Sequence, residues 1–397
     1  MLVSLILASV LIKGPDTGSQ ASAPTSSTAQ VPTSAPVPIV DSKHQADLDS
    51  DKAAGKKYSE QVEKETKLSK DIEGQKRVQR IGAEIAAVAN RTQIIATWGD
   101  KRFSPFNYTF KVLEGKDVNA FSLPGGYIYV YDGLLKYIES DDELAGVLAH
   151  EVSHASLRHV ATLEREYSKM EAIQLPLILV AILAGGNGGA NALTLGSLLG
   201  QATGSGWSLK AEQAADYGGF QYMLKTKYNP TGLLTVMERL ARDERNSPNI
   251  DLGIYRNHPP SRERAQSITQ DMQAQGIPIR RSLVATSFRC TVKPGDNGLV
   301  EVDFSGRKII AFAGTDALTR ADKIMETLND FFDSSPELYD VQLGPDGWIM
   351  ARRERLLQLT AEEGDAEKKP VEVVQLETLA NLKLAIYRLA YRVWDTR

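Results

Sequence analysis

The pentapeptide HEVSH at residues 150–154 constrains this chain more than any other feature of its sequence. The residues before it predict a helix, because Ser140 followed by Glu143 forms a capping-box pattern and an apolar run comes next. Residues four apart lie on one face of a helix, so His150 and His154 can direct both imidazoles at one metal ion. Neutral imidazole is a common ligand of Zn²⁺. We therefore expect this helix to carry a zinc site.

Glu151 lies about 100° round the helix from His150 and is placed to take a proton from a metal-bound water. The chain has five histidines: His44, His150, His154, His159 and His258. With so few, a chance H-E-x-x-H has a probability of roughly a few in a thousand, which disfavours the alternative of ordinary surface histidines. His159 follows His154 by five residues, so we expect it to hydrogen bond near the site or to pack there, and not to bind the metal.

Two histidines leave a catalytic zinc one protein ligand short, and the candidates are a later histidine or a carboxylate. Glu212 and Asp216 are again four residues apart. On a second helix, Glu212 could complete a His₂Glu site, and Asp216 could accept a hydrogen bond from a ligand imidazole. Alone, E-x-x-x-D is more often a solvated helix face, and only the upstream H-E-x-x-H makes the pair a credible candidate.

Several segments together resemble the gluzincin zinc endopeptidases of the CAAX-prenyl-protease/HtpX family, soluble bacterial envelope type. They are NAFSLPGG at 119–126, LAGVLAHEVSHASLRH at 144–159, EQAAD at 212–216, YNP at 228–230, and HPPS at 258–261 followed by Arg264. The resemblance covers about residues 60–275. One position departs from it, because Leu209 stands where the family usually has an Arg before the ligand Glu, and Lys210 could only partly replace that Arg.

The resemblance implies an α+β fold: a mainly helical, zincin-like metallopeptidase domain with a small edge β-sheet. It implies one Zn²⁺ per chain, held by His150, His154 and Glu212, with Glu151 as general base. Asn119, Ala120 and Phe121 would lie on an edge strand to which the substrate backbone adds by β-augmentation. His258 would lie near the site, as a transition-state donor or as an extra ligand from a plugging loop.

Four segments divide the chain. Residues 1–13 are apolar and signal-like, although an apolar N-terminal strand is the alternative. Residues 14–50 are rich in Pro, Ser, Thr and Ala and predict a linker, while 51–280 would form the metallopeptidase domain. In 281–397, hairpin patterns at 299–314 and around 344–347 and two amphipathic helices predict a further α+β domain. The first two segments favour export to the periplasm or envelope.

Residues 172–209 contain no charge, and their apolar run is too short to span a membrane. We expect an apolar hairpin or lid beside the cleft, with shallow peripheral membrane contact and plain buried core as the alternatives. Cys290 is the one cysteine, which excludes an intrachain disulfide and a site of several thiolates.

Composition excludes other classes of protein. Hydrophobic residues are 42% and charged residues 24%, as in globular proteins. A formal net charge of −4 gives no sign of a nucleic-acid partner. We therefore predict a zinc metalloendopeptidase that hydrolyses unfolded or extended protein or peptide substrates, serving envelope quality control. The rival is a self-plugged, chaperone-like zinc protein; a purely structural zinc site is disfavoured because such sites prefer thiolates.

Overall fold

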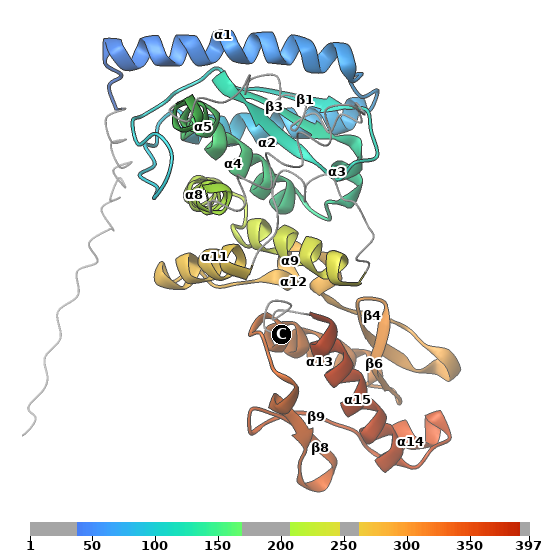
Figure 1. Cartoon of the computed structure of the whole chain (residues 1–397). Coiled ribbons are helices and arrows are strands. Elements are labelled where there is room, and N and C mark those ends of the chain that lie inside the picture. Colours follow the sequence, from blue (N-terminus) through green and yellow to red (C-terminus); the bar gives the residue numbers. More distant parts are fainter. Residues whose placement is uncertain (1–37, 169–206, 247–261, 390–397) are drawn as a thin grey trace, which may run out of the picture. The chain divides into compact units, whose positions relative to one another are not determined.

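The computed structural model describes residues 38–168, 207–246 and 262–389 (Figure 1). Two helices come first in this part of the chain. Helix α1 (Ser42–Glu65) starts after Asp41, whose side chain accepts a 2.8 Å hydrogen bond from the His44 amide. Helix α2 (Ile72–Ala89) is capped in the same way by Asp71. The expected linker at 14–50 is wrong for residues 42–50, because this N-cap and the buried Leu48 begin a helix there.

A three-stranded sheet follows, with strands β1 (Thr109–Leu113), β2 (Ala120–Leu123) and β3 (Tyr127–Tyr131). Its order is β1-β3-β2, with β3 parallel to β1 and antiparallel to β2. The strands predicted at 108–114 and 127–133 are confirmed. The outer side of β1 is bridged by Leu68, whereas β2 pairs with β3 alone among the described strands. β2 is therefore the edge that a further strand could join.

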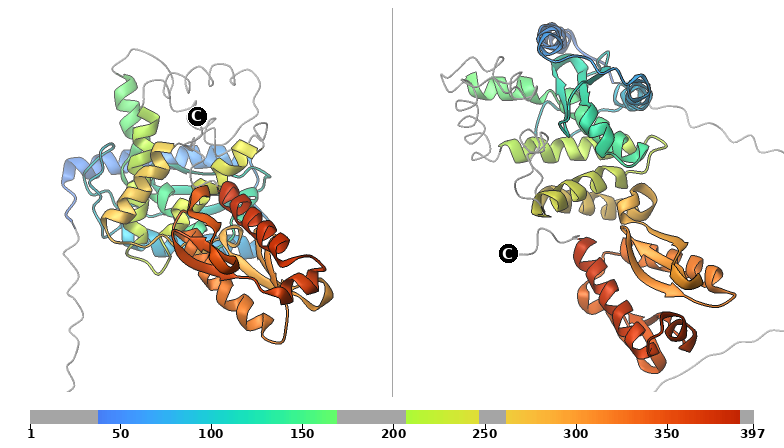
Figure 2. Two further views of the ribbon diagram at one scale, coloured as in Figure 1. Left: turned by 90° about the horizontal axis from the view of Figure 1, so that it is seen from below. Right: turned by 90° about the vertical axis from the view of Figure 1, so that its right-hand side faces the viewer.

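The two faces of this sheet are covered by different helices (Figure 2). On one face, Tyr58 and Val62 of α1 pack with Phe121 and Tyr129. On the other face the apolar side chains of β1 and β3 join the main core with α2 and with helix α4 (Asp141–Ser156). The alternation of side chains along each strand produces this division.

Helix α1 lies close to the turn η1 (Pro124–Gly126), which joins β2 to β3. A Cβ atom added at Gly55 would lie 1.8 Å from the Pro124 carbonyl oxygen. A Cβ at Gly125, where φ is 77°, would lie 2.7 Å from Cα of Lys52. Only glycine permits this approach of helix and turn.

Gly55→Ala is expected to lower the free energy of unfolding by about 1–3 kcal/mol, because the added methyl group overpacks against backbone that cannot move easily. Thermal unfolding followed by circular dichroism measures this. Lys56→Ala, at the exposed neighbouring position, is the control. An unfolding midpoint of Gly55→Ala at or above that of the wild type would show that α1 does not pack as described.

Helix α3 (Asp132–Tyr137) leads into α4, the helix that carries HEVSH. Ser140 caps α4 as predicted, because its side chain accepts a 3.1 Å hydrogen bond from the Glu143 amide. The reciprocal half of the expected capping box is wrong. The Glu143 carboxylate instead accepts from the Glu139 amide at 2.8 Å and pairs with Arg239 at 2.6 Å. Burial of Glu143 favours the charged partner on the facing helix over its own helix end.

Four helices complete the described residues of this part. They are α5 (His159–Ser168), α8 (Trp207–Met223), α9 (Thr231–Asn246) and α11 (Arg262–Ala274). The first three contact α4, and the last, α11, contacts α8 and α9. Helix α4 contacts α2, α8 and α9, which explains why its side chains are almost all buried.

Residues 281–389 have a separate hydrophobic core. Two antiparallel sheets, β4-β5-β6 and β7-β8-β9, pack with helices α13 and α15. The elements are α12 (Arg281–Val284), β4 (Cys290–Pro294), β5 (Val300–Phe304), β6 (Arg307–Phe312), α13 (Ala317–Asp333), β7 (Val341–Leu343), β8 (Trp348–Ala351), β9 (Glu354–Gln358), α14 (Ala361–Glu367) and α15 (Val371–Leu389). Single-turn 3₁₀ segments are η2 (Thr286–Phe288), η3 (Asp296–Gly298), η4 (Leu338–Asp340) and η5 (Pro345–Gly347). Both predicted hairpins and both predicted helices are present.

The fold is thus α+β and mainly helical with small sheets, as expected. The domain boundary at 280/281 stays a prediction, although the two cores share no residue. The signal-like segment at 1–13 and nearly all of the uncharged stretch at 172–209 lie outside the described residues. Within the described ranges, no helix is long and apolar enough to cross a bilayer.

Candidate metal centre

The structure brings three potential metal ligands together. His150 and His154 come from α4, and Glu212 comes from α8. The two imidazole Nε2 atoms are 3.0 Å apart. Glu212 places one carboxylate oxygen 3.3 Å from Nε2 of His150 and the other 3.4 Å from Nε2 of His154. The two Nε2 atoms and the two carboxylate oxygens thus lie together, and we call these three residues the ligand triangle.

This triangle fits a zinc ion. Tetrahedral coordination with bonds of about 2.0–2.1 Å separates neighbouring donor atoms by about 3.3 Å. The Nε2–Nε2 separation and the two Nε2–carboxylate separations, which involve different oxygens of Glu212, are of this size. In the described part of the chain, these residues form the group whose donor atoms could share one metal ion.

Two glycines let α8 approach α4 closely enough to present Glu212. A Cβ at Gly218 would lie 2.1 Å from the Ser153 hydroxyl oxygen, and one at Gly219 would lie 3.0 Å from the His150 amide nitrogen. Side chains at either position would push the helices apart and separate Glu212 from the imidazoles.

Asp216 contacts the opposite side of the His150 ring, with its carboxylate 2.9 Å from Nδ1. Nδ1–H therefore donates to Asp216 and leaves the Nε2 lone pair directed at the metal position. Burial by itself lowers the pKa of His150, but the hydrogen bonds with Asp216 and Glu212 outweigh burial and raise it to about 10. The carboxylates of Asp216 and Glu212 thus stabilise positive charge at this imidazole.

His154 has a different partner. Its Nδ1 atom lies 2.8 Å from Nδ1 of His159, so one of the two nitrogens must donate and the other accept. If His154 uses Nε2 as a ligand, its Nδ1–H donates to His159. Burial and the neighbouring His154 hold the pKa of His159 well below its usual value, so His159 is the neutral acceptor that this arrangement requires. Among the described residues, the group that could hold a metal consists of His150, His154 and Glu212, and His159 contacts it through His154.

Arg264 of α11 completes the charge arrangement. Its Nη1 lies 3.0 Å from Glu212, and Nε and Nη2 each lie 2.8 Å from the Asp216 carboxylate. Sequence reasoning noted Arg264 as the end of a family motif but gave it no role. Lys210, proposed as a partial replacement for the family's Arg, is exposed, and Arg264 supplies the ion pair to Glu212.

The acidic character of the cluster also suits a cation. Three buried acidic side chains, Glu151, Glu212 and Asp216, gather with the buried Arg264. Burying charge without a partner is strongly unfavourable. A divalent cation held by His150, His154 and Glu212 would add positive charge to this acidic group.

Arg264→Gln is expected to weaken zinc binding about 10–100-fold, because Glu212 and Asp216 lose the group that orients them. Competition with a chromophoric chelator measures the dissociation constant. Glu263→Gln changes an exposed neighbour on α11 and should bind zinc like the wild type. Equal affinity of the two variants would show that Arg264 does not support the ligand.

Not all of the other predicted site residues fall within the part of the chain that the structure describes. Asn119 immediately precedes β2 and is 1% exposed, and its side-chain amide has no hydrogen-bond partner within the described part of the chain. Ala120 and Phe121 lie in β2, and Phe121 stacks on Tyr129. His258 lies outside the described residues. Cys290 is buried, which raises the pKa of its thiol and agrees with a structural role.

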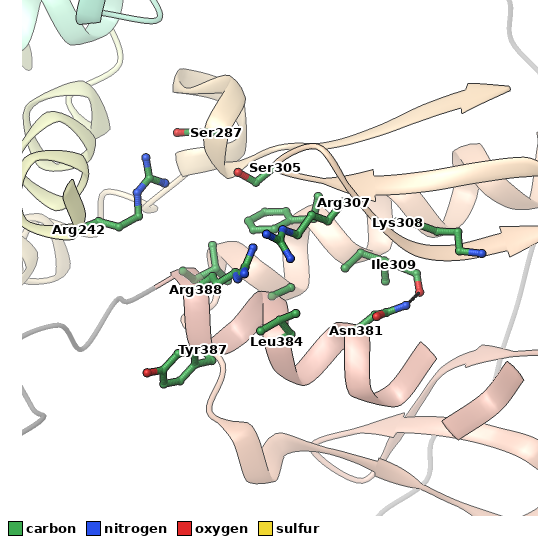
Figure 3. A pocket seen from close by; sticks show the side chains of 13 residues that line it. Arg242, Ser287, Ser305, Arg307, Lys308, Ile309, Asn381, Leu384, Tyr387 and Arg388 are labelled. Carbon is green, nitrogen blue, oxygen red and sulfur yellow. Dashed lines mark hydrogen bonds between the residues drawn. The ribbon is translucent and has the colours of Figure 1, made fainter. Parts of the chain in front are cut away.

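A cavity of about 780 Å³ lies elsewhere, between the β5–β6 hairpin and the end of α15 (Figure 3). Arg242, Arg307 and Arg388 are among its lining residues. Among the described residues that line it there is no histidine and no carboxylate.

Comparisons with known proteins agree with the geometry. Residues 74–271 match Peptidase family M48. The chain is 34% identical over 175 residues to metalloprotease LoiP of Escherichia coli K12, covering 44% of this chain and 65% of the relative. It is 29% identical over 179 residues to the beta-barrel assembly-enhancing protease of the same organism, covering 43% and 34%. Mitochondrial metalloendopeptidase OMA1 of Schizosaccharomyces pombe is 31% identical over 180 residues, covering 45% and 50%. The chain thus spans less than two thirds of each of these relatives.

Proposed function

Residues 74–271 are a domain of peptidase family M48, and from this premise we propose that the chain is a zinc metalloendopeptidase. The observation that carries the proposal is the triangle of His150, His154 and Glu212 with donor separations of 3.0–3.4 Å. The matched range lies close to the range of about 60–275 that the sequence motifs indicated. The three relatives are named as proteases, two of them as a metalloprotease and a metalloendopeptidase, and these names support a protease over the rival of a chaperone-like zinc protein.

Each residue of the site has a proposed task. His150, His154 and Glu212 hold zinc, which supplies Lewis acidity for the scissile carbonyl and for water. Glu151, adjacent to His150 on α4, accepts a proton from the attacking water and passes it to the leaving amine. Asp216 and His159 fix the tautomers of His150 and His154. His258 is proposed to act near the site as a transition-state donor or as a plugging ligand; His258→Ala would lower cleavage in the first case and raise it in the second.

Substrate is proposed to bind as an added strand along β2, with Asn119, Ala120 and Phe121 at its start. β2 is an edge strand, and α4 contacts it. Recognition through the main chain requires an extended segment, so unfolded or extended polypeptides are the proposed substrates.

The chain is further proposed to be exported to the periplasm or envelope and to degrade damaged or misfolded proteins there. The signal-like residues 1–13 and the Pro-rich segment after them support export. A relative named as a beta-barrel assembly-enhancing protease supports the envelope. Peripheral membrane contact is part of this proposal, and no nucleic-acid partner is proposed.

Cleavage of unfolded casein by the purified full-length chain tests the proposal. We expect cleavage that is lost on removal of metal with 1,10-phenanthroline and restored by added zinc. Cleavage that persists after the metal is shown to be removed would overturn a zinc mechanism. Zinc-loaded protein without any cleavage of unfolded substrates would overturn the assignment as an endopeptidase.

A further inference from the structure

We propose that helix α1, which precedes the range matched to the family, is part of the metal site. The carboxylate of Asp51 on α1 acts as a positioning residue: it holds Arg158, and Arg158 in turn fixes the segment that places His159 against His154. This inference rests on the proposed function, because it concerns the same zinc site. It extends the catalytic unit to residues outside 74–271.

Arg158 has an unusual backbone conformation. It lies between the end of α4 and the start of α5, with a φ of 52°, in the left-handed region that non-glycine residues rarely adopt. Such a conformation persists only where the surroundings hold it. The side chain is 5% exposed, so the groups that hold it are within the protein.

Those surroundings are carboxylates from two separate segments. The Arg158 guanidinium donates to both carboxylate oxygens of Asp51, with Nε at 2.5 Å from one and Nη2 at 3.0 Å from the other. Asp100 binds Nη1 of Arg158 at 2.8 Å. Arg102 then links Asp100 back to Asp47 of α1, at 2.6 and 2.9 Å. These contacts therefore run from α1 through Arg158, Asp100 and Arg102 back to α1. Two of the three carboxylates, Asp47 and Asp51, belong to α1.

The charged groups support one another electrostatically. Burial by itself raises the pKa of Asp100, but its hydrogen bonds with Arg102 and Arg158 outweigh burial and keep the pKa well below the usual value. Asp100 is therefore ionised at neutral pH. Replacing one member of such a buried network leaves another charge without its partner, so the effect should reach the residues that the network holds.

The same short segment that binds Arg158 also holds the His159 ring. Trp98 packs against His159, with ring centroids 4.9 Å apart. At Gly99, where φ is 99°, an added Cβ would lie 2.9 Å from that ring. The Asp100 amide donates a 2.7 Å hydrogen bond to the Leu157 carbonyl. Residues 98–100 thus contact both Arg158 and His159, and the His159 ring lies against the ring of His154.

Other contacts keep α1 in place when Asp51 changes. Lys111 binds Glu63 of α1 at 2.6 Å, and the Tyr129 hydroxyl donates to the same carboxylate at 2.7 Å. Gly55 packs on Pro124 as described above. Removing the Asp51 charge should therefore disturb Arg158 and His154 without detaching the helix.

The test compares Asp51→Asn with Asp49→Asn in the full-length chain. Asp49 lies on the same helix and is largely exposed, and its partners among the described residues are Lys52 and Gln45 of α1. The two variants remove the same charge from the same helix. We expect Asp51→Asn to weaken zinc binding about 10–100-fold, as when a ligand's supporting partner is lost, and Asp49→Asn to stay within about twofold of the wild type.

A spectroscopic signature separates positioning from mere stabilisation. The visible d–d bands of the Co²⁺-substituted protein report ligand geometry directly, so we expect them to shift in Asp51→Asn and not in Asp49→Asn. Arg158→Lys keeps the positive charge but loses the planar guanidinium that binds both oxygens of Asp51. Its Co²⁺ bands should shift in the same direction as those of Asp51→Asn. Asp51→Glu, which restores a carboxylate, should recover part of the zinc affinity.

These readouts do not depend on hydrolysis. If the wild type binds zinc but cleaves nothing, the proposed function fails while the positioning claim is still judged by the Co²⁺ bands. If Asp51→Asn and Arg158→Lys fold, lose only thermal stability, and keep wild-type zinc affinity and bands, α1 is a structural support and the inference is overturned. A wild type that binds neither metal overturns it as well.

Discussion

Glu151→Gln is expected to reduce casein cleavage by about 10²–10⁴-fold while the protein retains about one zinc per chain. Glutamine has nearly the same shape as glutamate but cannot accept the proton from the attacking water. Glu151 is not one of the three donor residues, so the ligand triangle should remain. Initial cleavage rates, together with zinc content by plasma mass spectrometry, measure both parts of the prediction.

The control for this variant is Glu60→Gln, which removes the same charge at an exposed position of α1. It should cleave like the wild type. If Glu151→Gln cleaves casein at the wild-type rate, the assignment of Glu151 as general base is wrong. If it instead loses zinc, Glu151 serves the metal and not the proton transfer.

His154→Ala is expected to lose both zinc and activity. It removes one of three protein donors, and structural zinc sites gain about 10–16 kcal/mol from four ligands, so one ligand corresponds to roughly a 10²–10³-fold change in affinity or more. His159 would also lose the imidazole that it contacts at 2.8 Å. Zinc content after dialysis against a weak chelator measures the loss.

Glu151→Gln is the matched comparison for His154→Ala, because it changes a residue of the same motif while keeping every donor. The two variants should therefore be equally inactive but differ in zinc content. Retention of one zinc per chain by His154→Ala, at wild-type affinity, would contradict the ligand set.

The zinc helix was predictable from the sequence because its information is local. Helical spacing alone places His150 and His154 on one face, and the Ser140 cap marks where the helix begins. The strands at 109–113 and 127–131 and the hairpins of residues 281–389 were predictable from alternation and turn residues. Glu212 was a credible ligand only beside the upstream H-E-x-x-H, since E-x-x-x-D alone is a common surface pattern, and the family resemblance then implied its role.

Long-range ion pairs were not predictable in this way. Arg264 meets Asp216 across 48 residues, and Arg158 meets Asp51 across 107 residues. No spacing rule connects such residues, because packing of separate helices brings them together. The same holds for Glu143, whose carboxylate pairs with Arg239 of α9 and does not make the expected capping contact. The start of α1 is not predictable from apolar spacing, because apolar residues are few in this helix and its N-cap is the single residue Asp41.

X-ray absorption at the zinc edge of the purified wild type tests the central claim most directly. The account predicts one zinc per chain with nitrogen and oxygen neighbours at about 2.0–2.1 Å and the outer-shell scattering of two imidazoles. A sulfur neighbour near 2.3 Å, a single imidazole, or no bound zinc after reconstitution would contradict the site of His150, His154 and Glu212.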